Sequence, residues 1–320
     1  MDVVEPALGM KATGARQPGN RRRALRHRLE YVAVRVAVGL SRLLPLRWAT
    51  AAGAALGRGV GPWRRQHRRA LQNLARAFPE KSHGEIETIA RRMWANMGRV
   101  MVETMLIDRI LEDTSRLVVS DHEYWAARMS QPGPSVGATL HMGNWELAIW
   151  PLTLFGQRPA GVYRPLANPL VDHLLRAQRV RLYPGGLFGK GEADEQGKGG
   201  QRTARLMIDH VRRGGCMGFV CDHNERRGVV IPFLGGRARF TPVPAMIARH
   251  VDARVWLGRC FRTGSEPRFR FDVKELELPR SGDRAADIQA LTAAIFAQFE
   301  IWIREHPEQW MWWNTRWMKT

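Results

Sequence analysis

The sequence has 320 residues, of which 50 are Lys or Arg and 30 are Asp or Glu, giving a formal net charge of +20. A hydrophobic content of 44% excludes a wholly disordered chain, and the length fits one large domain or two modest ones. The charge is uneven, because residues 1–100 hold 20 basic and 6 acidic residues and therefore carry +14 of the total. So basic a surface predicts an anionic partner, which on charge alone can be nucleic acid, a membrane or an acidic protein.

The N-terminal residues divide into two segments. Residues 1–28 are rich in Pro, Gly and Arg and are predicted to form a basic, flexible arm. Residues 29–62 are apolar but interrupted by arginines, and the longest uncharged run, about ten residues, falls well short of the 20 that a membrane span needs. We predict a helix that lies in the membrane interface and meets anionic lipids through its arginines. An amphipathic helix docked on the domain and a tilted span with snorkelling arginines remain alternatives.

Residues 63–320 are predicted to form one α/β domain. Two helices come first: apolar positions at helical spacing end before Pro79, and Ser82 opens the second helix. Short strands then alternate with helices, which is typical of a mixed central sheet flanked by helices. The predicted strands are Val136–Leu140, Ala160–Tyr163, Met217–Cys221, Arg254–Cys260 and Phe269–Val273. The predicted helices are Trp145–Phe155, Leu170–Val180, Arg202–Val211, Pro244–Ala248 and Ala285–Glu305.

The glycine-rich stretch Gly185–Gly200 contains Gly189-Lys190 but no Ser or Thr after the lysine, so it is not a Walker A phosphate loop. We predict a mobile loop there, either a lid over a site or a solvated insertion.

Three cysteines are predicted to be buried free thiols of a reducing compartment. Cys216 and Cys221 have four residues between them instead of two, and no second pair follows, so no zinc ribbon is predicted. No secretory cleavage site follows a basic and apolar start.

The segment with the clearest chemistry is the stretch V-G-A-T-L-H-M-G-N-W-E-L, residues 136–147. A strand delivers His141 to its end, Gly143 allows a tight turn, and Asn144 is predicted to cap the following helix. Four residues separate His141 from Glu146, a spacing at which the carboxylate can orient the imidazole as a general base. A capping histidine with a solvated glutamate is the alternative. Because no Ser or Cys stands beside this pair, we expect the nucleophile to be a hydroxyl of the substrate.

The hexapeptide H-M-G-N-W-E resembles the H-x4-D/E signature of the glycerolipid acyltransferases, and more closely that of the late acyltransferases of lipid A biosynthesis. Further blocks resemble those of the same family in the same order. They are R-A-L-Q-N-L-A-R-A-F-P (69–79), V-Y-R-P (162–165), G-F-V-C-D-H-N (218–224), V-V-I-P-F-L-G-G-R (229–237), T-P-V-P-A (241–245) and H-P-E-Q-W-M-W-W-N-T-R-W (306–317). The resemblance covers residues 25–319.

This resemblance implies transfer of a fatty acyl chain from an acyl carrier protein to a hydroxyl of a lipid A precursor, at the cytoplasmic face of the inner membrane. It implies His141 as the general base and Glu146 as the residue that orients it. Arg164, Asp222 and Asn144 are the predicted substrate-binding residues. No metal and no cofactor are expected.

Two other functions are alternatives to this one. Related enzymes use acyl-CoA as donor, or a phospholipid or glycolipid as acceptor. A nucleic-acid-binding protein is a different class, but no helix-turn-helix, zinc finger or RNA-recognition motif is present, so no nucleic acid partner is expected.

Overall fold

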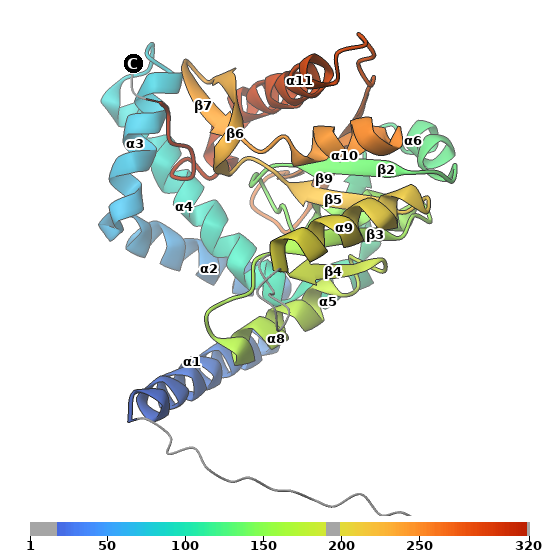
Figure 1. The fold of residues 1–320 in the computed structure, drawn as a ribbon. Helices are drawn as coiled ribbons and strands as arrows, with labels where there is room; N and C mark the ends of the chain where they lie inside the picture. Colours follow the sequence, from blue (N-terminus) through green and yellow to red (C-terminus); the bar gives the residue numbers. More distant parts are fainter. Residues whose placement is uncertain (1–17, 190–198, 319–320) are drawn as a thin grey trace, which may run out of the picture.

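The computed structural model describes residues 18–189 and 199–318. Its N-terminal part is helical (Figure 1), with α1 (Pro18–Leu43), α2 (Leu46–Val60), α3 (Arg65–Ala77), α4 (His83–Met105) and α5 (Ile107–Glu112). Helix α1 begins inside the segment predicted as an arm, of which residues 1–17 lie outside the described part. The apolar segment that follows is two helices, because α1 ends before Pro45 and α2 begins after it. Among the described helices, none is long and apolar enough to span a bilayer.

The two helices predicted around Pro79 are confirmed as α3 and α4. Helix α3 ends two residues before the proline, and α4 starts with a capping box in which Ser82 and Glu85 satisfy each other's backbone N–H groups. Helix α2 crosses α4 in close contact, because a Cβ atom on Gly98 of α4 would overlap the carbonyl oxygen of Gly53 on α2. Glycine at this crossing therefore lets the two helix backbones meet.

The rest of the chain forms a seven-stranded sheet in the order β1-β9-β8-β2-β5-β3-β4. Neighbouring strands are parallel except β8 and β9, which are antiparallel. The strands are β1 (Leu117–Val119), β2 (Ser135–Thr139), β3 (Pro159–Tyr163), β4 (Gly186–Gly189), β5 (Cys216–Val220), β8 (Arg254–Arg262) and β9 (Phe269–Leu276). The predicted mixed sheet is confirmed. Strand β4 falls at the start of the predicted glycine-rich loop, whose residues 190–198 lie outside the described part.

Helices cover both faces of this sheet. They are α6 (His122–Met129), α7 (Trp150–Leu154), α9 (Gly199–Arg212), α10 (Val243–Val251) and α11 (Arg284–Glu305). Helix α8 (Pro169–Arg179) lies instead against α1, α4 and α5. Successive residues of a strand point to opposite faces. In β8, accordingly, Val255 and Leu257 pack with the cluster that contains α10 and α11, whereas Trp256 packs with the cluster that contains α6 and α7.

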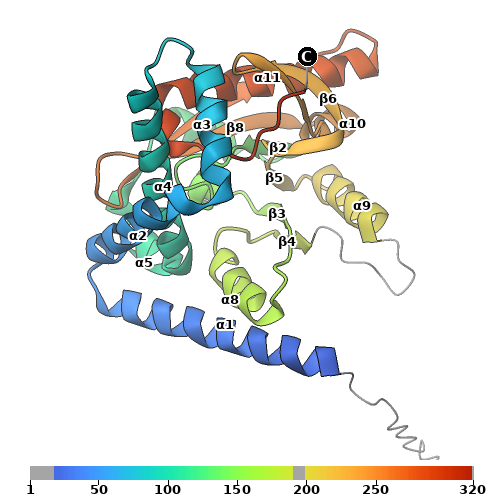
Figure 2. The same ribbon diagram turned by 90° about the vertical axis from the view of Figure 1, so that its left-hand side faces the viewer.

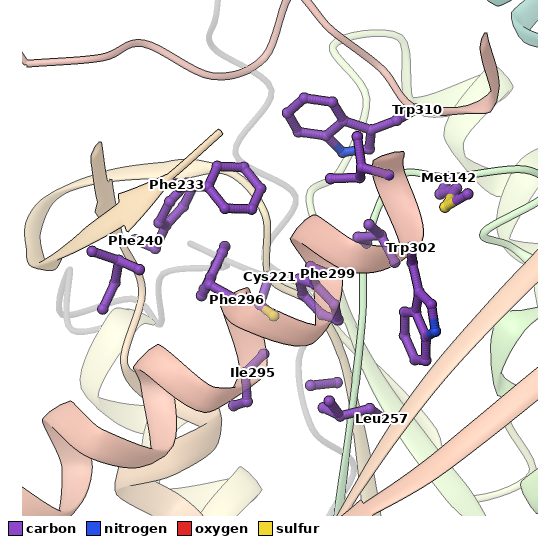
Figure 3. Packing of buried hydrophobic residues seen from close by; sticks show 14 of the residues in the cluster. Met142, Cys221, Phe233, Phe240, Leu257, Ile295, Phe296, Phe299, Trp302 and Trp310 are labelled. Atoms are coloured by element: carbon purple, nitrogen blue, oxygen red, sulfur yellow. The ribbon is translucent and has the colours of Figure 1, made fainter. Parts of the chain in front are cut away.

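Outside the main sheet, β6 (Asn224–Phe233) and β7 (Gly236–Phe240) form an antiparallel hairpin in the region predicted only as a family block. Its aromatic side chains continue the core (Figure 3): Phe240 stacks on Phe296 of α11, and Phe233 lies edge-on to Trp310. Trp310 and Trp312 are fully buried, so these two tryptophans pack inside the protein. The predicted burial of the three free cysteines is also confirmed.

Candidate active site

Two titratable side chains follow neighbouring strands of the sheet. His141 comes two residues after the end of β2, and Asp222 comes two residues after the end of β5. The two strands are adjacent and parallel, with Thr139 paired to Val220, so their carboxyl ends meet at one edge. This edge is where ligands bind in open α/β sheets. The structure therefore brings together two residues that the sequence had assigned to different tasks.

Asp222 holds His141 through both carboxylate oxygens. Its Oδ1 lies 2.6 Å from His141 Nδ1, and its Oδ2 accepts a hydrogen bond of 3.0 Å from the His141 backbone N–H. Trp310 donates its indole N–H to the same Oδ2 at 2.8 Å. Asp222 is fully buried, whereas 13% of the His141 side chain is exposed. The imidazole is thus anchored at one nitrogen and open to its surroundings elsewhere.

The charge of Asp222 is stabilised despite its burial. Burial alone would raise the pKa of this carboxyl, but the facing His141, with His223 and the Trp310 N–H, lowers the pKa to about 2. Asp222 is therefore an anion at neutral pH and accepts the proton on His141 Nδ1. That hydrogen bond selects the imidazole tautomer whose Nε2 is free to accept a proton.

Glu146 contacts a different partner. Both of its carboxylate oxygens pair with the guanidinium of Arg179 on α8, with Arg179 Nε 2.6 Å from Oε2. Burial opposes the charge of Arg179, but Glu146 outweighs it and the pKa of the guanidinium is raised. No hydrogen bond joins His141 to Glu146 in the described part of the chain. The predicted orienting role of Glu146 stays a prediction.

The turn after His141 is tightly packed. Gly143 has a φ of +55°, and a Cβ atom there would overlap the carbonyl oxygen of Cys260. The prediction that Asn144 caps a helix is wrong: its side chain donates to Glu103, and regular structure begins only at Leu147. Asn144 is fully buried, and its predicted contact with substrate stays a prediction.

Arg164 directly follows β3, the other neighbour of β5, and its side chain is exposed. Since β3 and β5 are parallel, Arg164 lies at the same edge of the sheet as His141. The His223 and Trp145 rings also lie beside His141, with ring centroids 4.4 and 5.3 Å from its own. Within the described residues, no group of three or more His, Cys, Asp or Glu side chains is arranged to hold a metal ion.

Two contributors to the site were not predicted as such. In the sequence, Trp310 is only part of the block 306–317 that resembles the family, and Arg179 is only part of the predicted helix Leu170–Val180. Trp310 reaches the site because the C-terminal segment pairs with the histidine turn: Met142 forms a β-bridge to Trp310, and the Met311 N–H donates to the His141 carbonyl. Such a contact across some 170 residues has no local sequence pattern.

Comparison with known proteins agrees with the motifs. The model of the family described as bacterial lipid A biosynthesis acyltransferase matches residues 19–319. The lipid A biosynthesis myristoyltransferase of Escherichia coli K12 is 22% identical over 275 residues, which covers 81% of this chain and 77% of that protein.

Proposed function

Since the chain belongs to the bacterial lipid A biosynthesis acyltransferase family, and is therefore an O-acyltransferase, we propose that it uses His141 to move a fatty acyl chain from an acyl carrier protein to a lipid A precursor. The acceptor is a hydroxyl group, and the donor is a thioester. The observation that carries this proposal is the hydrogen bond of 2.6 Å between His141 Nδ1 and the buried Asp222.

In the proposed reaction, His141 Nε2 takes the proton of the acceptor hydroxyl as its oxygen attacks the thioester carbonyl. An ester bond forms and the carbon–sulfur bond breaks, and the imidazolium then returns the proton to the departing thiolate. Asp222 stabilises the transient imidazolium through Nδ1, because its lowered pKa keeps it ionised throughout. Asp222 thus takes the role of orienting carboxylate, in place of the substrate contact that the sequence suggested for it.

Arg164 is the proposed contact for an anion of the reaction. Its exposed guanidinium follows β3 at the edge that carries His141. A guanidinium binds phosphate oxygens in a forked geometry and also stabilises developing negative charge on a carbonyl oxygen. A lipid A precursor supplies the first kind of anion and the thioester carbonyl the second.

The proposed place of action is the cytoplasmic face of the inner membrane, with α1 on anionic lipid. Six large apolar side chains of α1 recur at spacings of three and four residues and are 55–81% exposed: Leu25, Leu29, Val32, Val36, Leu40 and Leu43. The opposite face of α1 carries His27, Tyr31, Val34 and Val38, which are buried or half-buried, and the helix runs along α8 (Figure 2). Both earlier interpretations of this segment are thus combined: one face docks on the protein, and the other face is the proposed lipid contact.

The direct test is transfer of radiolabelled acyl chains to a lipid A precursor by the purified protein. We expect His141→Ala to lower kcat roughly 10²- to 10⁴-fold, the usual contribution of a general base. His173→Ala, at an exposed histidine of α8, is the matched control and should keep wild-type kcat. Equal transfer by wild type and His141→Ala would remove the basis of the proposal.

The same assay separates the donors. Acyl carrier protein thioester and CoA thioester are offered in parallel at equal concentration. Faster transfer from the acyl carrier protein is expected. Faster transfer from the CoA thioester would show that CoA is the donor, and the proposed role of His141 would be unchanged.

A further inference from the structure

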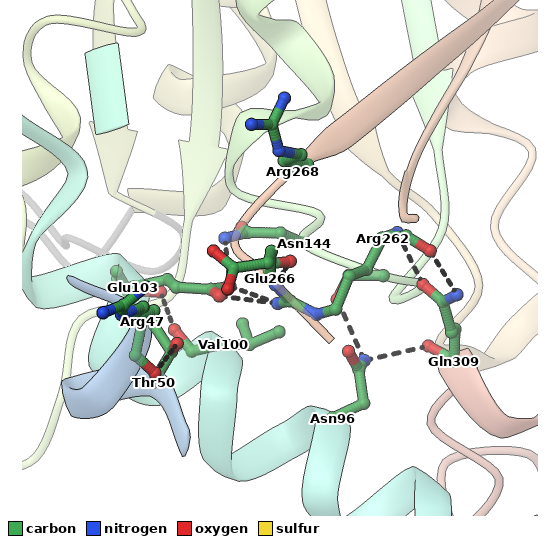
Figure 4. Close-up of polar contacts among 12 residues, drawn as sticks. Arg47, Thr50, Asn96, Val100, Glu103, Asn144, Arg262, Glu266, Arg268 and Gln309 are labelled. Carbon is green, nitrogen blue, oxygen red and sulfur yellow. Dashed lines mark hydrogen bonds and ion pairs between the residues drawn. The ribbon is translucent and has the colours of Figure 1, made fainter. Parts of the chain in front are cut away.

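A buried ion pair contacts Asn144, which lies in the turn after His141 (Figure 4). Glu103 comes from α4 and Arg262 from the end of β8, and Arg262 Nη2 lies 2.6 and 2.7 Å from the two carboxylate oxygens. The two side chains are 0% and 4% exposed. Two charges in the interior lose their hydration, so a buried pair is often no more stable than apolar residues of equal size. Stability therefore gives no sufficient reason for this pair.

The ion pair reaches the catalytic turn through Asn144. Glu103 Oε2 accepts a hydrogen bond of 3.0 Å from Asn144 Nδ2, and Asn144 is three residues from His141. Two turns earlier on α4, Asn96 donates its side-chain N–H to the Gly143 carbonyl at 3.1 Å. Helix α4 thus holds two consecutive residues of the turn.

The other half of the pair connects to the side of the site that holds Asp222. The Arg262 backbone N–H donates to the Gln309 side chain at 2.8 Å, and the Gln309 amide donates back to the Arg262 carbonyl at 3.0 Å. The Gln309 carbonyl also accepts the Gly143 N–H at 2.9 Å. The next residue, Trp310, donates to Asp222. These hydrogen bonds, together with the main chain of Arg262 and the peptide bond between Gln309 and Trp310, therefore connect Glu103 to the carboxylate that contacts His141.

We propose that Glu103 and Arg262 are positioning residues of the acyl transfer: acting through Asn144 and Gln309, they fix the turn so that His141 stays on Asp222. This inference rests on the proposed function of His141. Neither residue touches the reacting atoms, since both are buried behind the turn. Their effect is on the placement of the base, where an error of about 1 Å costs about 10²-fold in rate.

The test separates positioning from stability by replacing the pair with apolar residues of similar size. Glu103→Leu/Arg262→Met leaves no unpaired charge, so we expect it to fold. We expect its kcat to fall about 10²-fold with little change in KM for either substrate, because Arg164, the proposed anion contact, is untouched. The matched control is Asp287→Leu/Arg249→Met, which replaces the ion pair between α11 and α10 and should keep wild-type kcat.

Asn144→Ala shows whether the effect runs through this residue. Alone it should lower kcat about as much as the double variant, and added to the double variant it should lower kcat no further. If the double variant does not fold, Asn144→Ala alone carries the test, since it leaves the ion pair intact. A raised KM with unchanged kcat in Asn144→Ala would instead indicate the substrate contact predicted from sequence and overturn the inference.

The outcomes distinguish this inference from the proposed function. If His141→Ala is inactive and a folded Glu103→Leu/Arg262→Met variant keeps wild-type kcat, the positioning role is wrong and the general base stands. If His141→Ala is fully active, both are wrong. Additive losses in the triple variant would overturn the route through Asn144.

Discussion

At the scale of single residues, the site consists of two carboxylates with different partners. Asp222 faces His141 and is fully buried, whereas Glu146 faces Arg179. Two carboxylates in unlike surroundings can take unlike roles, and the contact with His141 supports the proposed orienting role of Asp222. Two substitutions compare the roles directly.

Asp222→Asn is expected to lower kcat roughly 10³- to 10⁴-fold. The asparagine amide can donate to His141 Nδ1, which moves the imidazole proton to Nε2 and removes the base. Steady-state acyl transfer measures the effect. Asp252→Asn is the control, because Asp252 lies on the surface in a left-handed conformation that asparagine adopts equally well. A fully active Asp222→Asn enzyme would show that a group other than Asp222 orients His141.

If the Glu146 carboxylate stabilises the imidazolium of His141, it does so only in the transition state. Glu146→Gln is therefore expected to lower kcat more than it raises KM. Arg179→Gln removes the other half of the same ion pair and is the comparison. Identical kinetics for the two variants would mean that Glu146 acts through its ion pair with Arg179 of α8. That result would contradict a direct action of Glu146 on His141. Circular dichroism at each step verifies that both variants are folded.

At the scale of elements, the crossing of α2 and α4 couples the N-terminal helices to the site, because α4 also carries Asn96 and Glu103. Gly98→Ala is expected to lower the free energy of unfolding by about 3 kcal/mol, since its Cβ would overlap the Gly53 carbonyl and force the helices apart. Denaturant unfolding measures the change.

The control for this crossing lies on α2 itself. Gly59 has no atom within 4 Å of the position of an added Cβ, so Gly59→Ala should raise stability by roughly 0.5–1 kcal/mol through helix propensity. Two glycine-to-alanine changes of opposite sign separate the crossing from a general effect of alanine. A neutral Gly98→Ala would show that α2 and α4 can separate at no cost.

Helix α1 supplies the second prediction at this scale. Val36→Ser/Leu40→Ser removes two exposed apolar side chains, each contributing about 1.5 kcal/mol when transferred into lipid, so partition onto anionic vesicles should fall about 100-fold. Co-sedimentation with the vesicles is the measurement. Leu206→Ser/Met246→Ser changes two exposed side chains of α9 and α10 and should leave partition unchanged. Equal loss in both pairs would contradict a specific lipid contact by α1.

At the scale of the whole molecule, local patterns predicted the elements and missed their connections. The alternation of strands and helices indicated the mixed sheet, and His141 at a strand end indicated the reacting edge. Short pieces with weak periodicity were missed: β1, β4 and α6 have three, four and eight residues. Glu146 was assigned to His141 from the four-residue spacing and the family resemblance, neither of which indicated its ion pair with a residue 33 positions later.

The contact between His141 and Asp222 spans 81 residues, and its prediction needs the order of strands in the sheet. Strand order depends on how the helices pack over each face, which hydrophobic periodicity does not encode. The same holds for Glu103 and Arg262, 159 residues apart, since two isolated charged residues in separate elements carry no sign that they will meet inside the protein. Resemblance to a family identified the motifs but not these pairings.

The return of the C-terminal segment to the histidine turn has a consequence for biosynthesis. A nascent chain acquires its elements from the N-terminus onward, so the N-terminal helices and every strand of the sheet leave the ribosome before Gln309 and Trp310 do. Until then the histidine turn lacks its bridge to Trp310, and Asp222 lacks its indole donor. A chain that ends immediately before position 309 would contain His141, Asp222 and all seven strands of the sheet. It would still lack the Trp310 indole that donates to Asp222.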